Sequence, residues 1–110
     1  MSSPRKLLVV DDEEDILDLI QDMLLMAGHQ VTVAHDGKKA MELIEQGDFD
    51  MVFTDLKMPG VSGMDLVRHV RENLPGTGVV MVTGYGSIQG AVSAVKLGAD
   101  EYLAKPVSLE

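Results

Sequence analysis

The chain contains no cysteine, which excludes disulfide bonds and thiolate metal sites and fits a reducing compartment. No apolar stretch approaches the length that is needed to span a bilayer. Arg5 and Lys6 precede only a short apolar run, residues 7–10, so the start of the chain lacks the pattern of a secretory signal. From these absences we expect a soluble domain in the cytoplasm that does not associate with a membrane.

Basic residues are few. Nine Lys and Arg residues stand against 18 Asp and Glu residues, which gives a formal net charge of −9 at pH 7. Nucleic-acid binding needs a basic surface that neutralises phosphates, so we expect no direct nucleic-acid binding by this chain. The length of 110 residues suits one hydrophobic core, and we expect a single domain over residues 1–110.

Short apolar runs alternate with longer stretches of helical periodicity, which is typical of βα units around a parallel sheet. The expected strands cover residues 7–10, 31–34, 51–54, 79–82 and 102–104. The expected helices cover residues 13–26, 37–45, 64–72 and 87–97. In the first of these helices the predicted buried stripe consists of Ile16, Leu19, Ile20, Met23 and Leu24. Gly28 is placed to end that helix.

The apolar character of each run predicts its place in the sheet. The runs at 7–10, 51–54 and 79–82 are apolar on both faces, as central parallel strands must be. The run at 31–34 alternates and the run at 102–104 is short, which suits edge strands. This pattern predicts a flavodoxin-like α/β fold, a doubly wound parallel five-stranded sheet with the order 2-1-3-4-5.

Four of the runs are followed by polar residues that suit phosphoryl transfer, namely Asp11, Asp12, Asp55, Thr83 and Lys105. The carboxyl ends of parallel strands share one edge, where open α/β sheets bind ligands. Taken singly, each residue has a simpler explanation as a helix-starting acid, a turn acid, a strand residue or a surface cation. Their occurrence together makes the simpler explanations weak and predicts a site.

The charges of these residues indicate which ligands the site would bind. Three carboxylates in a small volume repel one another, and a divalent cation relieves that repulsion. An all-oxygen site with few protein ligands suits Mg²⁺. Carboxylates are nucleophiles in aspartyl-phosphate formation. Asp55 stands alone after a central strand and is the best candidate nucleophile. Asp11 and Asp12 form the part of the site that would bind the metal, the metal end.

These residues lie in segments that resemble the receiver domains of two-component response regulators. The matching segments are residues 8–13, 55–64, 82–84 and 105–106, in the family's order and spacing. The most specific is Asp-x-x-Met-Pro-x-x-x-Gly, which begins at Asp55 and ends at Gly63. Residues 83–87 and 91–99 further resemble receivers of nitrogen-regulation-type transcription activators.

The resemblance implies a phosphoacceptor switch in signal transduction, not an enzyme with a separate substrate. Asp55 would accept a phosphoryl group from a histidine kinase or a phosphotransfer protein. Mg²⁺ would be bound by Asp12 directly, by Asp11 through water and by the backbone carbonyl of Lys57, with Asp55 in the same metal site.

The resemblance also assigns roles to three residues near the end of the chain. Lys105 would hold one phosphoryl oxygen, Thr83 would move its hydroxyl onto another, and Tyr102 would move inward with Thr83. The bond between Lys105 and Pro106 would be cis. Phosphorylation would shift the face built by the fourth strand, the fourth helix and the fifth strand to an active state.

The chain departs from the family pattern after Pro106. Receivers normally end in a fifth helix, but residues 107–110 are too few to form one. We therefore expect a receiver domain that is truncated before this helix and has a bare apolar strip beside its first helix. Such a strip predicts self-association.

Three other assignments compete with this resemblance. A phosphatase of the haloacid dehalogenase type would need a second Asp two residues after Asp55, where this chain has Lys57. A flavodoxin-like FMN carrier would need a hydroxyl-rich phosphate loop after the first strand, where the acids at 11–15 would repel the phosphate. A degenerate receiver that docks partners without phosphorylation remains the main alternative, although no site residue is missing.

Overall fold

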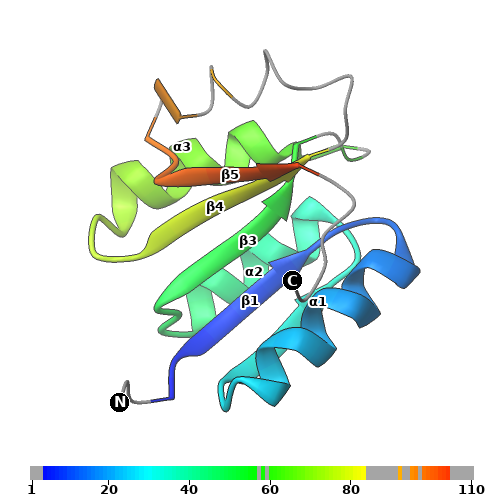
Figure 1. Cartoon of the computed structure of the whole chain (residues 1–110). Helices are drawn as coiled ribbons and strands as arrows, with labels where there is room; N and C mark the ends of the chain where they lie inside the picture. The colour runs from blue at the N-terminus through cyan, green and yellow to red at the C-terminus, as the bar shows by residue number, and fades with distance from the viewer. Residues whose placement is uncertain are drawn as a thin grey trace.

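One parallel sheet organises the computed structural model, which describes residues 4–56, 58, 60–83, 92, 95–96 and 98–104. The strands are β1 (Lys6–Val10), β2 (Gln30–Ala34), β3 (Met51–Asp55), β4 (Gly78–Thr83) and β5 (Glu101–Ala104). The described helices are α1 (Glu14–Met26), α2 (Gly37–Gln46) and α3 (Gly63–Asn73). The strand order is β2-β1-β3-β4-β5 with every pair parallel, which confirms the predicted sheet (Figure 1).

Helices cover the sheet from both sides, with α1 on one face and α2 and α3 on the other (Figure 1). Leu8 and Val10 of β1 belong to the larger core cluster, which includes residues of α2 and α3. Val9 belongs to a second cluster with Leu17 and Ile20 of α1. Successive strand residues point to opposite faces, so a strand covered on both faces must be apolar throughout. This requirement explains why continuous apolar runs identified the central strands.

Helix α1 begins one residue later than expected, and its buried stripe differs from the predicted one at Leu17 and Leu19. Glu13 is its N-cap, with an extended backbone at φ −96° and ψ 113°. Leu17 and Ile20 are buried against the sheet, whereas Leu19, which was expected in the buried stripe, is 37% exposed. The prediction for Leu19 was wrong because the three-residue step from Leu17 to Ile20 faces the sheet, rotating Leu19 toward solvent. Gly28 has a φ of 92° and ends the helix as predicted.

Helix α3 begins at a capping box directly after the loop that follows β3. The Ser62 hydroxyl accepts a hydrogen bond from the Asp65 N–H at 3.2 Å, and the Asp65 carboxylate accepts one from the Ser62 N–H at 2.9 Å. Gly63 is the first helical residue, and a Cβ at this position would overlap the Asp55 carbonyl oxygen. The glycine therefore lets α3 begin in direct contact with the end of β3.

An apolar groove lies on the α1 side of the sheet and has a volume of about 90 Å³. Its lining residues are Ile20, Met23, Leu24, Phe53, Val82 and Leu103. This groove lies beside the first helix, where the bare apolar strip was expected. The bareness of the strip and self-association stay predictions. The expected helix over 87–97 lies largely outside the described residues, and residues 105–110 lie wholly outside them. Across the described part of the chain, none of the helices is both long and apolar enough to cross a membrane.

Candidate functional site

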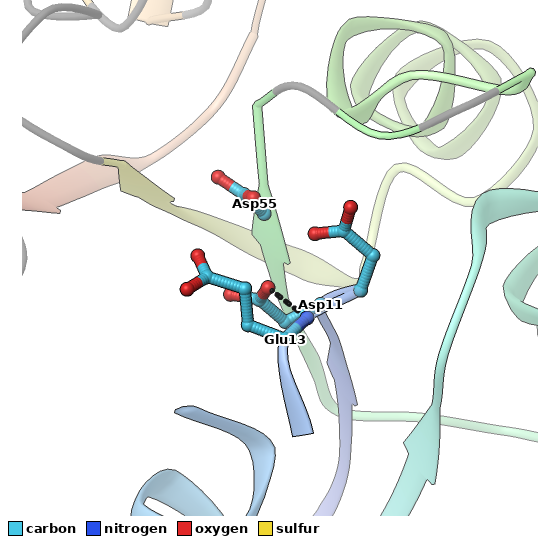
Figure 2. Close-up of side chains that lie close together, drawn as sticks. Asp11, Glu13 and Asp55 are labelled. Atoms are coloured by element: carbon cyan, nitrogen blue, oxygen red, sulfur yellow. Dashed lines mark hydrogen bonds between the residues drawn. The ribbon is translucent and has the colours of Figure 1, made fainter. Parts of the chain in front are cut away.

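Four carboxylates gather where β1 and β3 end. Each contributes one ligand oxygen to a group whose atoms all lie within 4.8 Å of one another, and we call Asp11, Asp12, Glu13 and Asp55 the acidic cluster. Figure 2 shows the labelled side chains of Asp11 and Glu13 beyond the end of β1 and that of Asp55 at the end of β3. The predicted convergence of Asp11, Asp12 and Asp55 is therefore present in the structure.

The chain after β1 turns sharply, and this turn places Asp11 and Glu13. The Asp11 N–H donates to the Ala34 carbonyl at 3.2 Å and so continues the pairing of β1 with β2. The Asp11 carboxylate accepts a hydrogen bond from the Glu13 N–H at 2.9 Å, two residues on, which is an Asx turn (Figure 2). Asp11 is only 1% exposed, so the turn holds its carboxylate in the floor of the site.

Asp55 is placed by β3 and by the loop that follows it. It is 8% exposed, and its Oδ1 accepts a hydrogen bond from the Leu56 N–H at 2.8 Å. The Thr54 hydroxyl donates to the Asp55 carbonyl at 3.0 Å. These bonds, with Gly63 packed on the same carbonyl, fix the backbone and the carboxylate of Asp55 at the cluster.

Sequence reasoning missed Glu13 as a member of the site. Its side chain makes no capping hydrogen bond to α1, although Glu13 occupies the N-cap position. The carboxylate lies instead with those of the acidic cluster. A signal was present in the sequence, because a residue two positions after a turn-forming aspartate is carried back toward that aspartate.

The acidic cluster fits the preferences of Mg²⁺. Its donors are hard carboxylate oxygens, and it contains no nitrogen or sulfur ligand. Oxygens on opposite sides of a Mg²⁺ ion lie about 4.2 Å apart, since each binds at about 2.1 Å. The cluster's 4.8 Å limit is close to that span, so small side-chain movements would bring its oxygens into range.

The register of the strands places Thr83 at the same edge as Asp55, and it places Tyr102 inside the sheet. Asp55 pairs with Val82, and Thr83 follows as the last residue of β4. Thr83 in turn pairs with Ala104, the last residue of β5. The backbone of Tyr102 pairs with Met81 inside the sheet.

Several predicted features fall where the structure gives no description. The side chains of Thr83 and Tyr102 are not described, and Lys57 and Lys105 lie outside the described residues. The predicted cis bond at Lys105 therefore also lies outside them. The roles of these four residues stay predictions.

Comparison with known proteins supports the same assignment. The family model of the response regulator receiver domain matches residues 7–110. The chain is 41% identical to the response regulator protein PilR of Pseudomonas aeruginosa over 107 residues, which cover 97% of this chain and 24% of PilR. It is 39% identical to the transcriptional regulatory protein CpxR of Escherichia coli over 101 residues, which cover 92% of this chain and 43% of CpxR. The chain thus spans less than half the length of these relatives.

Solved structures share the fold. A response regulator receiver domain protein from Clostridium thermocellum has a TM-score of 0.88 and 39% identity, with 94% of this chain and 84% of that chain covered. The receiver domain of NtrX from Brucella abortus has a TM-score of 0.87 and 36% identity, with 93% of this chain and 87% of that chain covered. The NtrX match supports the resemblance to nitrogen-regulation-type receivers. The family match, the sheet order and the acidic edge lead to one conclusion: this chain belongs to the family of response regulator receiver domains of two-component systems.

Proposed function

We propose that this receiver domain accepts a phosphoryl group on Asp55 in a Mg²⁺-dependent reaction, with residues 1–110 acting as one domain. Membership of the receiver family supports a role in phosphorelay signalling. The observation that carries the proposal is the acidic cluster, which joins a buried aspartate at the end of a central strand to three further carboxylates.

Asp55 is the nucleophile because of its position and its fixed orientation. It ends β3, in the middle of the sheet, and the Leu56 N–H holds its Oδ1. Asp11 Oδ1 also accepts a backbone N–H, but this bond closes the turn after β1, and Asp11 is more deeply buried than Asp55. This division supports Asp55 as the acceptor and Asp11 and Asp12 as the metal end.

The donor is a phosphohistidine of a histidine kinase or a phosphotransfer protein. An Asp55 carboxylate oxygen forms the new bond to phosphorus, the bond between phosphorus and the histidine nitrogen breaks, and the electron pair stays on that ring nitrogen. Bound Mg²⁺ would supply positive charge that offsets the repulsion between the carboxylates and the phosphoryl oxygens. Asp11, Asp12, Asp55 and the Lys57 carbonyl would hold it.

The remaining assignments follow the strand register. Thr83 and Ala104 end their strands as a pair, and Lys105 comes next in the sequence. Thr83 and Lys105 contact the phosphoryl oxygens, and Tyr102 moves with Thr83, shifting the surface that includes β4 and β5. This shift passes the signal to partners. With a net charge of −9, we expect the domain itself to make no direct contact with nucleic acid.

Intact-mass spectrometry after incubation with acetyl phosphate and Mg²⁺ tests the proposal. We expect one phosphoryl adduct on the wild-type protein and none on Asp55→Asn or in EDTA. Asp22→Asn is the matched control, because Asp22 is an exposed acid on α1 outside the acidic cluster, and it should form the adduct normally. A folded wild-type chain without an adduct would favour the docking module that works without phosphorylation.

A further inference from the structure

A second polar network lies at the opposite, amino end of β4 and β5. Arg71, in the last turn of α3, donates from Nη1 to the Pro75 carbonyl at 3.3 Å and from Nη2 to the Thr77 carbonyl at 2.9 Å. Nη2 also donates to Asp100 Oδ2 at 2.7 Å. One guanidinium therefore ties the end of α3, the loop before β4 and the residue before β5 to one another.

Asp100 connects this network to β4 directly. Its Oδ2 also accepts the Val79 N–H at 2.7 Å, and its own N–H donates to the Val79 carbonyl at 2.8 Å. Asp100 thus pairs with Val79 one step before the first pair of the β4–β5 ladder, which joins Val80 to Glu101. We call these contacts of Arg71, Asp100 and Val79 the register clamp.

Gly98 brings the chain across Arg71 just before the clamp. Its φ is +126°, and a Cβ at this position would overlap the Arg71 side chain. The backbone therefore lies directly on the aliphatic part of Arg71. A larger residue would push apart the two segments that the clamp joins.

A clamp supports the register of β5 because the strand is short, lies at the edge of the sheet and is little buried on its α1 face. β5 has four residues and pairs only with β4, as an edge strand. On the α1 face, Glu101 is exposed and Leu103 is 41% exposed, so burial on that face gives little preference for one register. A slip of one residue would move the strand by about 3.3 Å and turn every side chain to the other face.

We propose that Arg71 and Asp100 are positioning residues for the phosphoryl site. They set the register of β5 on β4, and this register places Ala104, the residue before Lys105 in the sequence, opposite Thr83. The inference rests on the proposed role of Lys105. The charge attraction alone is a weak explanation, since the side chains of Arg71 and Asp100 are 25% and 52% exposed and exposed ion pairs contribute little. The shared acceptor on Asp100 does the positioning.

Four variants separate positioning from general stability. Arg71→Met keeps the aliphatic stem under Gly98 and removes the guanidinium, and Arg68→Met is its control on the exposed face of α3. Asp100→Asn keeps an oxygen for the Val79 N–H, whereas Asp100→Ala removes it. Cross-strand nuclear Overhauser effects between β4 and β5 report the register, and intact mass reports the rate of Asp55 phosphorylation by acetyl phosphate.

We expect Arg71→Met and Asp100→Ala to weaken the native contacts between Val80 and Glu101 and to slow phosphorylation about tenfold, as loss of alignment does. Asp100→Asn should lie between these variants and the wild type, and Arg68→Met should match the wild type. If Arg71→Met does not fold, the two Asp100 variants still separate an effect on the register of β5 from a general loss of stability. Folded variants with the native register and the wild-type rate would overturn the proposal, as would a lost register at an unchanged rate. A wild-type chain that takes no phosphoryl group would instead overturn the proposed function, while the register is still read from the unphosphorylated protein.

Discussion

At the carboxyl ends of the strands, the four carboxylates of the acidic cluster lie within 4.8 Å of one another, whereas at the amino end Asp100 lies 2.7 Å from the Arg71 guanidinium. Another acid at the amino end, Asp50, accepts the Lys6 N–H at 2.8 Å. One end thus gathers four acids of like charge, and the other pairs Asp100 with a cation and Asp50 with a backbone donor. Like charges that are held close lower stability until a cation binds, so the comparison indicates that the carboxyl end serves binding and the amino end holds the scaffold.

The largest effect should come from filling the tight backbone contact at the carboxyl end. Gly63→Ala would place a Cβ against the Asp55 carbonyl. Neither the backbone at the start of α3 nor the backbone at the end of β3 can move easily to make room. We expect the free energy of unfolding to fall by about 3 kcal/mol, as for overpacked sites. Gly76→Ala is the control, because a Cβ there meets nothing within 4 Å, and its stability should stay the same or rise slightly. Urea denaturation measures both, and equal effects would show that the contact of Gly63 with the Asp55 carbonyl does not cause the loss of stability.

Changing Asp to Asn should alter the free energy of unfolding by a smaller amount, with opposite sign at the carboxyl and amino ends of the strands. Asp11→Asn removes one of the repelling charges and keeps an oxygen for the Glu13 N–H, so it should stabilise the protein in EDTA by about 1 kcal/mol. Asp100→Asn weakens the bond to Arg71 and should destabilise the protein.

Thermal stability measured with and without Mg²⁺ tests the comparison of the two ends further. The proposed Mg²⁺ site predicts that the wild-type protein gains thermal stability from Mg²⁺ and that Asp11→Asn gains less. Differential scanning calorimetry with EDTA and with Mg²⁺ makes both measurements. An Asp11→Asn protein that is less stable than the wild type in EDTA would show that the acidic cluster is not under charge strain.

The smallest effect concerns the capping box of α3. Hydrogen bonds from the Ser62 backbone N–H and hydroxyl, with a smaller contribution from the Arg68 charge, hold the pKa of Asp65 below its ordinary value. Because the folded pKa is lowered, the stabilisation is fully present above the unfolded pKa of about 3.9 and is lost as pH falls through the lower folded pKa. Asp65→Asn should therefore cost less than about 1 kcal/mol at neutral pH. Its difference from the wild type should shrink in acid, and a difference that stays constant with pH would contradict the assignment.

Sequence patterns predicted the sheet order because a strand buried on both faces must be largely apolar. The runs at 7–10, 51–54 and 79–82 met this condition, with Thr54 as their one polar residue. They predicted three members of the acidic cluster because parallel strands end at one edge. The buried stripe of α1 was less well predicted. Leu17 and Leu19 are both apolar, and only the seating of α1 on the sheet decides which of them is buried.

The sequence by itself thus determined the fold class and the family, and it placed Asp11, Asp12 and Asp55 at one edge, because periodicity and strand ends are local properties of the chain. The tertiary structure decided that Glu13 joins those acids, since its carboxylate is brought to Asp55 only by the turn after β1 and the pairing of β1 with β3. It also decided the contact of Arg71 with Asp100, 29 residues away in the sequence. No periodicity encodes such a pair, because it depends on where a helix end meets the start of a neighbouring strand.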